Sequence, residues 1–582
     1  MGSIGVVTGK DFVSQEEFLL ESGEALPELR VHYETYGDFK GGAAPAVWIC
    51  CPFTTDAHAA GLQDENNPKS VGWWDDIIGP GKPINTDIFF VVCSNNLGGC
   101  KGTSGPISTN PRTGKPYGST FPQITIGDMV NAQKKLADHL EIKKLFAVIG
   151  GSMGGFQAIA WALEYPDFVE RCAIIASGTR LSAQALGFEM VGRKIILDDE
   201  NFNGGDYTEQ KKPSNGLANA RKIAHITYLS AESMRNRFDH AENLPKDPKK
   251  FYTGTALENY LTHQGEKFVN RFDANSYLHL TWAMDNFDLE KKYGSLKNAV
   301  ARANAEFLCV HLSSDWLFTP EESYRLTFAL LNQKKIVSSV ELNTNLGHDG
   351  FLLETEDLGN LLSRFLDVRS VERRDENYNA SPFACEEDIN RISALIPQNA
   401  SVLDIGCGDG RMLHALWRQR RSIGVGFDRS FDGVLHCLEY DVPIIQKDLD
   451  KNGLSQIADK SFDFVIFNRT LQETQNPRDV LLEILRIGKQ VVVTFPNFGN
   501  WMVRKTLMLS GSMPKNKLLP HEWHSTPNIH LFTLKDFIWL CKNEGIHIKK
   551  LEFTNHSPLS ELLTKCGFRN LGAEQVVALI SV

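Results

Sequence analysis

Residues 144–166 read KLFAVIGGSMGGFQAIAWALEYP, and this stretch decides the fold. A short apolar run typical of a buried strand leads into a glycine-rich turn with Ser152, and a segment of helical periodicity follows. A serine in the pattern G-x-S-x-G on a sharp strand-to-helix turn needs small neighbours, because the turn is crowded and its backbone strained. Four glycines flank this serine: Gly150, Gly151, Gly154 and Gly155. The stretch therefore predicts a nucleophile elbow, with a glycine-rich turn and an incidental serine as the alternative.

Short apolar runs recur on both sides of this turn and predict the rest of a sheet. They lie at 46–52, 87–94, 172–178, 306–313 and 337–343. Runs of this kind suit a parallel sheet covered on both faces, and helical periodicity between them, as at 129–140, indicates a doubly wound α/β fold. The stretch of about 180–300 is mostly helical and polar, and we interpret it as a lid inserted between two strands.

A second α/β unit is expected after a break in composition. Residues 371–382 belong to a charged stretch with few apolar side chains, which predicts a linker. The first domain then covers 1–370 and the second 383–582. Strand signals restart in the second domain at 401–406, 422–428, 442–448, 462–468 and 490–497. No internal repeat relates the two halves.

Composition excludes several classes of protein. The 582 residues carry a net charge of -10, so the chain lacks the basic footprint of a nucleic-acid binder. No stretch approaches 18 apolar residues, and the N-terminus lacks a signal-peptide pattern, so we expect neither a membrane span nor secretion. The 11 cysteines show no CxxC pair and no metal-like spacing. These features predict a cytoplasmic protein with free thiols and no bound metal.

A serine nucleophile needs a base, and the base needs a carboxylate that orients it. In this fold the chain order is serine, acid, histidine. Asp315 follows the strand signal at 306–313, and His348 follows the one at 337–343. Taken singly, the aspartate could be a helix N-cap and the histidine a surface loop residue. In this order and at these strand ends, they predict a catalytic triad with Ser152.

The oxyanion hole of such an enzyme uses two backbone N–H groups. One is expected from Met153, directly after the nucleophile, and the other from Phe53 or Thr54 in the loop after an earlier strand. His58 lies in the same loop, and we interpret it as structural rather than as the base.

Several segments together carry a family resemblance. FTTDAHAAG, GGSMGGFQAIAWALEYPDFV, ARKIAHITYLS, SSDWLFTP and GHDGFLLE resemble the homoserine O-acetyltransferase family, MetX, over roughly residues 10–368. The resemblance implies an α/β-hydrolase sheet with a helical lid and a ping-pong acyl transfer from acetyl-CoA to L-homoserine. It also implies that Arg221 and Asp349 hold the substrate, a role that suits a zwitterion needing one cation and one anion. Without the resemblance, Arg221 would be one helix arginine among several. The expected partners are these small molecules and a second copy of the chain in a homodimer.

Leu317 occupies a position that resembles an acyl-group selector. The family resemblance implies that members using succinyl-CoA carry an arginine directly after the motif SDW, where it can pair with the distal carboxylate of the succinyl group. A leucine cannot compensate a buried carboxylate, so the sequence predicts acetyl-CoA over succinyl-CoA. Three alternatives stay open: a homoserine O-succinyltransferase, an esterase of the same fold, and an inactive scaffold.

The second domain opens with VLDIGCGDG at 402–410, an apolar strand that ends in an acid and a glycine turn. Gly406 and Gly408 allow close approach of backbone to a ligand, but the dinucleotide fingerprint G-x-G-x-x-G is not matched. Asp404, and Asp428 after the next strand, favour S-adenosylmethionine, because an acid at such a strand end can bind ribose hydroxyls. An ordinary strand-to-helix turn without ligand is the alternative.

The whole tail, roughly 383–582, resembles the methionine-biosynthesis protein MetW, a member of the class I methyltransferase superfold with a Rossmann-like sheet. The segments FDFVIFNRTLQET, VVVTFPNFGNW and PHEWHSTPNIHLFT carry this resemblance together with the glycine turn. Asp448, after the third strand, is expected to meet the adenine. Fold alone does not establish a methyl acceptor, so methyl transfer, sensing of S-adenosylmethionine and purely structural support all remain open.

Overall fold

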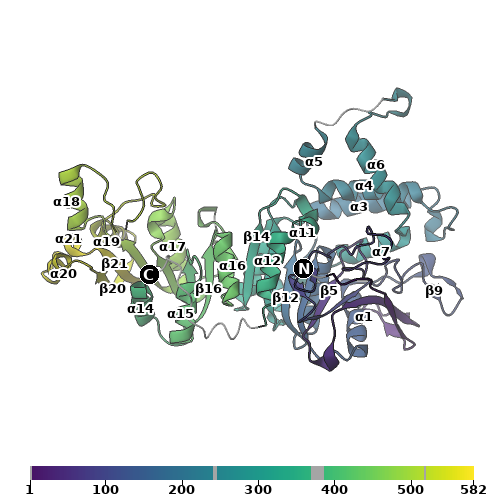
Figure 1. Ribbon diagram of the computed structural model, residues 1–582, viewed down its shortest axis with the longest axis horizontal. Coiled ribbons are helices and arrows are strands. Elements are labelled where there is room, and N and C mark those ends of the chain that lie inside the picture. The colour runs from purple at the N-terminus through teal and green to yellow at the C-terminus, as the bar shows by residue number, and fades with distance from the viewer. Residues whose placement is uncertain (1–2, 240–245, 369–385, 452, 517–518) are drawn as a thin grey trace. The chain divides into compact units, whose positions relative to one another are not determined.

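The computed structural model describes residues 3–239, 246–368, 386–451, 453–516 and 519–582 (Figure 1). The chain forms two compact units, Met1–Leu366 and Asp367–Val582. The predicted linker, 371–382, lies outside the described residues.

The N-terminal unit is built on an eight-stranded sheet in the order β1-β4-β8-β5-β11-β12-β13-β14. Strand β4 is antiparallel to both of its neighbours, β1 and β8, and the remaining neighbours pair in parallel. The predicted α/β-hydrolase sheet is thereby confirmed. The strands are β1 (Lys10–Ser14), β4 (Leu29–Tyr36), β5 (Ala46–Cys50), β8 (Phe90–Ser94), β11 (Leu145–Gly151), β12 (Val169–Ile175), β13 (Glu306–Leu312) and β14 (Val337–Leu342).

The central strands are apolar because both faces of the sheet are covered. Every residue of β5 and β8 is buried, as expected of strands between two helical layers. Trp48 on β5 and Trp161 on α2 are fully buried, with ring centroids 5.7 Å apart. The helices that alternate with these strands are α1 (Ile126–His139), α2 (Met153–Glu164), α10 (Pro320–Asn332) and α12 (Thr355–Phe365).

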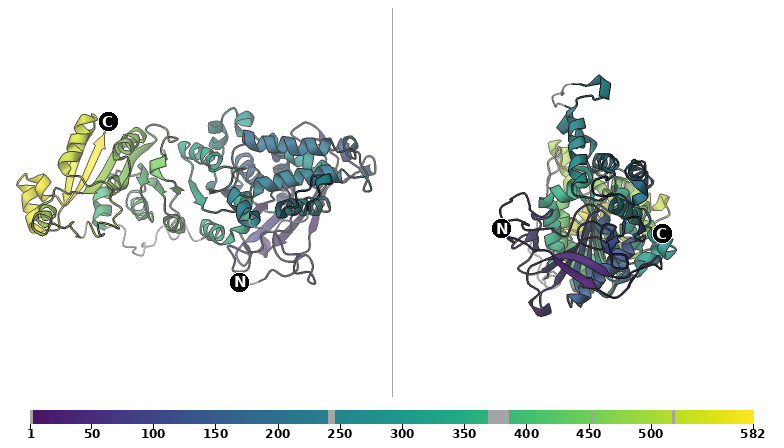
Figure 2. Two further views of the ribbon diagram at one scale, coloured as in Figure 1. Left: turned by 90° about the horizontal axis from the view of Figure 1, so that it is seen from above. Right: turned by 90° about the vertical axis from the view of Figure 1, so that its right-hand side faces the viewer.

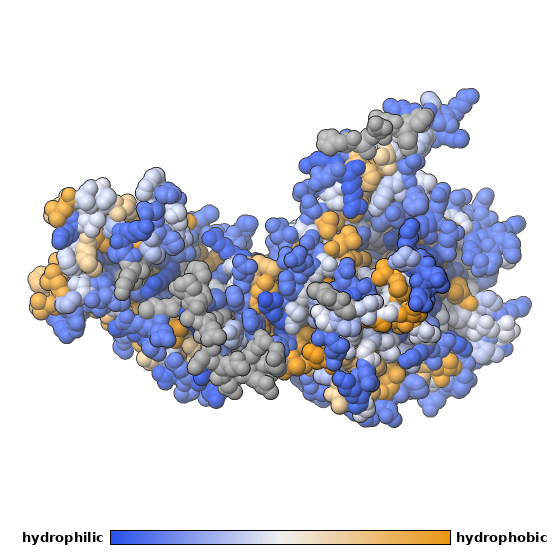
Figure 3. All heavy atoms as spheres, viewed as in Figure 1, coloured by the Kyte–Doolittle hydropathy of each residue, from blue (hydrophilic) through white to orange (hydrophobic). Residues whose placement is uncertain are grey.

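A helical insertion stands between β12 and β13, within the stretch where the sequence predicts a lid. Its main helices are α3 (Ala183–Leu197), α4 (Ser214–Tyr228), α5 (Ala231–Phe238), α6 (Ala256–Val269) and α7 (Ala274–Asp285). Helix α4 packs against both α3 and α6. Helices α5 and α6 project from the rest of the unit (Figures 1 and 2), and the surface of this projection is mostly hydrophilic in Figure 3.

Short elements complete the N-terminal unit. The short strands are β2 (Phe18–Leu19), β3 (Ala25–Leu26), β6 (Ile78–Gly79), β7 (Ile84–Asn85), β9 (Thr109–Asn110) and β10 (Lys115–Pro116). The short helices are α8 (Leu289–Tyr293), α9 (Leu296–Ala301) and α11 (Gly350–Leu353).

The C-terminal unit has a seven-stranded sheet in the order β17-β16-β15-β18-β19-β21-β20. All neighbours are parallel except β21, which is antiparallel to both β19 and β20. The strand order reverses between β15 and β18, and in open α/β sheets ligands bind at such a switch point. The strands are β15 (Ser401–Ile405), β16 (Ile423–Asp428), β17 (Ile444–Gln446), β18 (Phe462–Asn468), β19 (Gly488–Pro496), β20 (His547–Thr554) and β21 (Gln575–Ser581).

The helices of this unit are α14 (Glu386–Leu395), α15 (Arg411–Arg420), α16 (Phe431–Glu439), α17 (Pro477–Ile487), α18 (Trp501–Ser510), α19 (Leu534–Asn543), α20 (Pro558–Lys565) and α21 (Arg569–Gly572). Within the described ranges of both units, no helix is long and apolar enough to cross a bilayer.

Candidate active site

Ser152 occupies the turn between β11 and α2, and its backbone is strained. Its φ is 57° and its ψ is -125°, a conformation that non-glycine residues rarely adopt. A Cβ added at Gly150 would lie 2.0 Å from the carbonyl oxygen of Gly154, and one added at Gly154 would lie 2.4 Å from that of Cys50. The glycines are therefore required for the sharp turn that presents the serine.

Asp315 and His348 come from the loops after β13 and β14 and meet at the serine. The Nε2 atom of His348 lies 2.8 Å from Ser152 Oγ, and its Nδ1 lies 2.6 Å from Asp315 Oδ2. The other carboxylate oxygen, Oδ1, accepts hydrogen bonds of 2.9 Å from the backbone N–H groups of Leu317 and Phe318. All three predicted triad residues are buried and hydrogen-bonded in the order that nucleophilic catalysis needs.

Two carboxylates tune the imidazole of the base. Burial lowers the pKa of His348, but the charges of Asp315 and Asp349 outweigh it, so that the pKa lies above its usual value. The ring of Phe318 stacks on the imidazole with centroids 5.3 Å apart. The environment thus stabilises the imidazolium that forms when Ser152 loses its proton.

The predicted oxyanion residues adjoin the serine in the chain or line the same cavity. Met153 is the first residue of α2, and Phe53 and Thr54 line the cavity in front of Ser152. Arg271 in the lid donates through Nη1 to the carbonyl oxygen of Thr54 at 2.9 Å. Since this contact joins the lid to the loop at 51–58, the lid helps to fix the backbone that is expected to hold the oxyanion.

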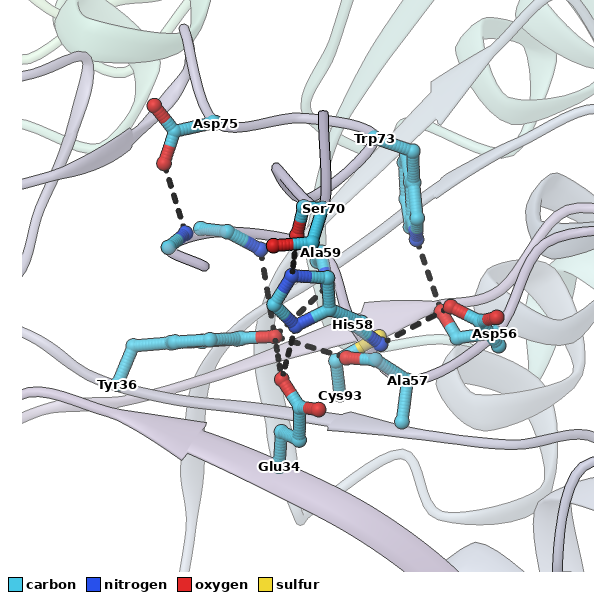
Figure 4. Close-up of polar contacts among 12 residues, drawn as sticks. Glu34, Tyr36, Asp56, Ala57, His58, Ala59, Ser70, Trp73, Asp75 and Cys93 are labelled. Atoms are coloured by element: carbon cyan, nitrogen blue, oxygen red, sulfur yellow. Dashed lines mark hydrogen bonds and ion pairs between the residues drawn. The ribbon is translucent and has the colours of Figure 1, made fainter. Parts of the chain in front are cut away.

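A buried polar network supports the same loop (Figure 4). His58 Nδ1 lies 2.9 Å from Glu34 Oε2, and its Nε2 lies 2.9 Å from the carbonyl oxygen of Ser70. The hydroxyl of Tyr36 lies 2.9 Å from the same glutamate oxygen and accepts from the N–H of Ala59 at 2.7 Å. His58 is held within this network, in keeping with a structural role.

A cavity of about 410 Å³ opens at the triad. Arg221, Asp349 and Leu317 all line it, so the structure brings the predicted substrate and acyl-group residues to the nucleophile. The Arg221 guanidinium lies over the rings of Tyr228 and Phe268, at 5.2 and 4.8 Å from their centroids. Burial raises the pKa of the Asp349 carboxyl, against the lowering effect of His348 and Arg221. The guanidinium of Arg221 and the carboxyl group of Asp349 thus line the same cavity.

Sequence reasoning missed three further residues at this cavity. Tyr228 lies seven residues after Arg221 on α4, and that spacing of two helical turns could have indicated a shared face. Arg271 and Glu189 carry no comparable signal, because the packing of the lid places them. Burial raises the pKa of Glu189 to about 8, and its Oε2 has no hydrogen-bond partner among the described residues.

In the C-terminal unit, the predicted ligand residues gather at the carboxyl ends of β15 and β16. Gly406 and Gly408 have φ values of 73° and 56°, and Gly408 N–H donates to Asp428 Oδ2 at 2.7 Å. A Cβ added at Gly408 would meet no atom within 4 Å, so the turn faces open space. Asp404 is buried, and its Oδ1 has no hydrogen-bond partner among the described residues. An orphaned carboxyl oxygen beside an open glycine turn fits a bound polar ligand.

Asp448 follows β17, the next strand of this sheet. Its Oδ1 accepts a hydrogen bond of 3.1 Å from the N–H of Asp450. The three predicted acids therefore stand at the ends of three adjacent strands. In neither unit do the described residues contain a cluster of three or more metal-ligating side chains.

The elbow, the triad geometry and the sheet define the N-terminal unit as a member of the α/β-hydrolase class. Comparison with known proteins agrees. The α/β hydrolase fold family matches residues 68–352, and the family of methionine biosynthesis protein MetW matches 386–579. The bifunctional methionine biosynthesis protein MetXA/MetW of Rhodopirellula baltica is 41% identical over 534 residues, which is 89% of this chain and 84% of that protein. The chain belongs to this bifunctional MetXA/MetW family, as the sequence predicts.

Shorter relatives match the N-terminal unit alone. The homoserine O-acetyltransferase of Leptospira biflexa is 46% identical over 367 residues, covering 63% of this chain and 95% of its own. The crystal structure of homoserine O-acetyltransferase from Bacillus anthracis is 27% identical, with a TM-score of 0.59 over 62% of this chain and 98% of that one. Esterase E22 is 32% identical, with a TM-score of 0.58 over 62% of this chain and 100% of that one.

Proposed function

We propose that the N-terminal unit transfers the acetyl group of acetyl-CoA to the hydroxyl of L-homoserine, giving O-acetyl-L-homoserine. The observation that carries this proposal is the triad of Ser152, His348 and Asp315, which opens onto a cavity lined by Arg221 and Asp349. Kinship with homoserine O-acetyltransferases supports the choice of substrates.

The first half-reaction acylates the serine. Ser152 Oγ attacks the thioester carbonyl while His348 Nε2 takes its proton. The backbone N–H of Met153, with that of Phe53 or Thr54, stabilises the negative charge on the tetrahedral oxygen. The carbon–sulfur bond then breaks, and CoA leaves as the thiol with the proton from His348.

The second half-reaction transfers the acetyl group to homoserine. Arg221 binds the carboxylate of the amino acid, and Asp349 binds its ammonium group. The homoserine hydroxyl gives its proton to His348, and its oxygen attacks the carbonyl carbon of the acetyl-serine. The bond between that carbon and Ser152 Oγ then breaks, and His348 returns the proton to Ser152. Arg221 and Asp349 therefore determine which acceptor reaches the acyl-enzyme in place of water.

Hydrolysis of a simple ester is the second candidate, because the chain is 32% identical to esterase E22 and shares its fold. The triad serves both reactions, and only the acceptor differs. A homoserine O-succinyltransferase is disfavoured, because the apolar side chain of Leu317 cannot pair with the distal carboxylate of a succinyl group.

One assay separates these functions. Purified full-length chain is incubated with acetyl-CoA, with and without homoserine, and thiol release and O-acetylhomoserine are measured, with p-nitrophenyl acetate in parallel. We expect homoserine-dependent product and a loss of about 10³-fold or more in Ser152→Ala. Ester hydrolysis without transfer would identify an esterase, and an unchanged rate in Ser152→Ala would exclude the triad.

For the C-terminal unit we propose binding of S-adenosylmethionine, which supplies an electrophilic methyl group when bound. Asp404, Asp428 and Asp448, with the turn at Gly406 and Gly408, would hold it. The orphaned Oδ1 of Asp404 supports this proposal. Titration calorimetry of the full chain with S-adenosylmethionine tests it, with Asp428→Ala as the variant expected to lose binding. No binding heat with wild type would leave a structural role for the unit, and equal heats with both proteins would exclude Asp428 from the site. If binding is found, product analysis distinguishes methyl transfer from sensing.

A further inference from the structure

A second cavity of about 410 Å³ adjoins the catalytic one, and its lining is strongly basic. Its charged and titratable residues are Arg221, His225, Arg237, Lys267, Arg271, Asp349 and Tyr260. We call this space the basic chamber. Two of its arginines and its aspartate also line the catalytic cavity, so the two spaces share a wall.

The cations of the basic chamber exceed its anions. Among the described residues of the lining, four side chains, Arg221, Arg237, Lys267 and Arg271, are positively charged, and Asp349 is the one carboxyl group. Within the part of the chain that the structure describes, none of the four forms an ion pair of 4.0 Å or less with a carboxylate. The excess also affects a neighbour: burial first, and then the charge of Arg221, lowers the pKa of His225 to about 4.

Homoserine does not account for this excess. Its single carboxylate is matched by Arg221, and its ammonium group by Asp349. Arg237 and Lys267 then remain without a counter-charge from the amino acid. Both side chains are exposed to solvent at the outer part of the chamber, whereas Arg221 is buried next to the triad cavity. The chamber thus offers charges along a path that runs from solvent toward Ser152.

We infer that the basic chamber binds the phosphate groups of the acyl-CoA nucleotide, with Arg237 and Lys267 as their principal contacts. This inference rests on the proposed function. The thioester arm then extends past Arg221 to the triad. In a ping-pong reaction CoA leaves before homoserine binds, so the two substrates can use the same arginine in turn.

A part of the catalytic cavity outside the basic chamber is the rival position for the nucleotide. There, Lys69 is accompanied by Asp56, whose carboxylate opposes an anionic ligand. The electrostatic attraction on a polyanion is stronger from several unpaired cations than from one lysine next to a carboxylate. The basic chamber is therefore favoured, and Lys69 provides a matched control.

The test compares Arg237→Gln, Lys267→Gln and their double variant with wild type and with Lys69→Gln. We expect KM for acetyl-CoA to rise about 5-fold in each single variant and more than 10-fold in the double variant, as charge-assisted contacts of this kind are lost. The KM for homoserine and the melting temperature should change little, because both side chains are exposed. The salt dependence of kcat/KM for acetyl-CoA should also become weaker in the double variant.

A substrate without phosphates isolates the proposed contact. With S-acetylpantetheine, which lacks every phosphate of CoA, wild type and variants should have equal kcat/KM. The inference is overturned if the Arg237 and Lys267 variants also lose kcat/KM with S-acetylpantetheine, or if their KM for acetyl-CoA is unchanged. It is likewise overturned if Lys69→Gln raises the KM for acetyl-CoA as much as they do.

If wild type transfers no acetyl group at all, the proposed function fails, but the chamber can still be tested. Calorimetry with CoA itself should then show binding by wild type and at least 10-fold weaker binding by the double variant. Equal affinities, or no binding of CoA by wild type, would overturn the inference.

Discussion

The imidazole of His58 is held between two acceptors: its Nδ1 lies 2.9 Å from Oε2 of Glu34, and its Nε2 lies 2.9 Å from the carbonyl oxygen of Ser70. With Glu34 ionised, an acceptor lies at each ring nitrogen and each nitrogen carries a proton, so the two residues form an ion pair of imidazolium and buried carboxylate. Burial lowers the pKa of His58, but its hydrogen bond to Glu34 and the charge of that residue raise it above the usual value. The pair joins β4 to the loop that carries Phe53 and Thr54.

We expect His58→Ala to destabilise the protein by about 3–5 kcal/mol, because it leaves the Glu34 carboxylate buried without its cation. Urea denaturation of the full chain near pH 6 measures this loss. The kcat for acetyl transfer should fall as well, since the loop at 51–58 is no longer fixed.

The double variant His58→Ala with Glu34→Gln is the control, and it should recover part of the stability because no buried charge remains. The direction in which this stability loss changes with pH follows from the raised pKa of His58. A histidine with a raised pKa contributes fully below about pH 6.5, and the contribution is lost as the pH rises through the raised pKa. A difference between wild type and His58→Ala that grows toward pH 9 would contradict the ion pair.

The second prediction concerns the pH profile of acylation. Asp349 is one of two carboxylates that raise the pKa of His348. Asp349→Asn removes its charge, so the imidazolium is less stabilised and the pKa should fall. The base must be neutral to accept the serine proton. The acid limb of the pH profile, in which the rate of the acylation burst is plotted against pH, should therefore move to lower pH. Rapid-quench measurement with acetyl-CoA alone avoids the effect of this variant on homoserine binding.

Leu352→Ala, at the rim of the same cavity, is the matched control, since it removes no charge. Its acid limb should coincide with that of wild type. A limb that stays in place in Asp349→Asn, or moves to higher pH, would show that this carboxyl does not act on the base.

Most of the fold can be predicted from sequence because its central strands are buried on both faces. Strands β5, β11 and β13 are nearly continuous apolar runs, which is the signal that a covered parallel sheet requires. Strand β4, with the sequence LRVHYETY, has no such run, because it alternates and carries the buried Glu34 of the loop network. Strand β21 is apolar, but its antiparallel position between β19 and β20 depends on pairing across the chain.

The candidate triad can be predicted for a related reason. Ser152, Asp315 and His348 each follow a parallel strand, and parallel strands end at one edge of the sheet. The contact between Arg271 and Thr54 joins residues 217 positions apart and depends on how the lid packs. No local pattern in the sequence predicts that packing, so the basic chamber can be identified only from the structure.

The third prediction concerns the acyl group. Leu317 lines the catalytic cavity, and its N–H donates to Asp315. Because that contact comes from the backbone, Leu317→Arg should leave the triad intact while adding a cation to the cavity. We expect kcat/KM for succinyl-CoA to rise by about 10-fold or more relative to acetyl-CoA, as the distal carboxylate gains a partner.

Leu317→Met is the control, because it keeps an apolar side chain of similar volume and should preserve the preference for acetyl-CoA. The assignment of Leu317 to acyl selection fails if wild type already prefers succinyl-CoA. It also fails if the arginine and methionine variants have the same ratio of specificities.

The last prediction concerns the buried acid of the C-terminal unit. Burial, followed by the charges of Asp428 and Asp409, raises the pKa of Asp404 to about 8. The folded protein therefore holds this proton more tightly than the unfolded chain, whose aspartates titrate near pH 3.9. The stability supplied by the proton is complete below about pH 4 and is lost as the pH rises toward 8. Asp404→Asn keeps the shape without titrating, so it should stabilise the unit more at pH 9 than at pH 5.

Asp463→Asn is a control of opposite sign in the same unit. Its hydrogen bond from Lys489 and those from Ser401 lower the pKa of Asp463 to about 2. The ionised Asp463 thus contributes stability above about pH 4, and this is lost as the pH falls toward 2. Asp463→Asn should be destabilising at both pH 5 and pH 9, by similar amounts.

Thermal unfolding of the full chain at the two pH values compares the variants. If the melting temperature of Asp404→Asn differs from that of wild type by the same amount at pH 5 and pH 9, Asp404 does not titrate in this range, and a neutral carboxyl at the end of β15 is excluded.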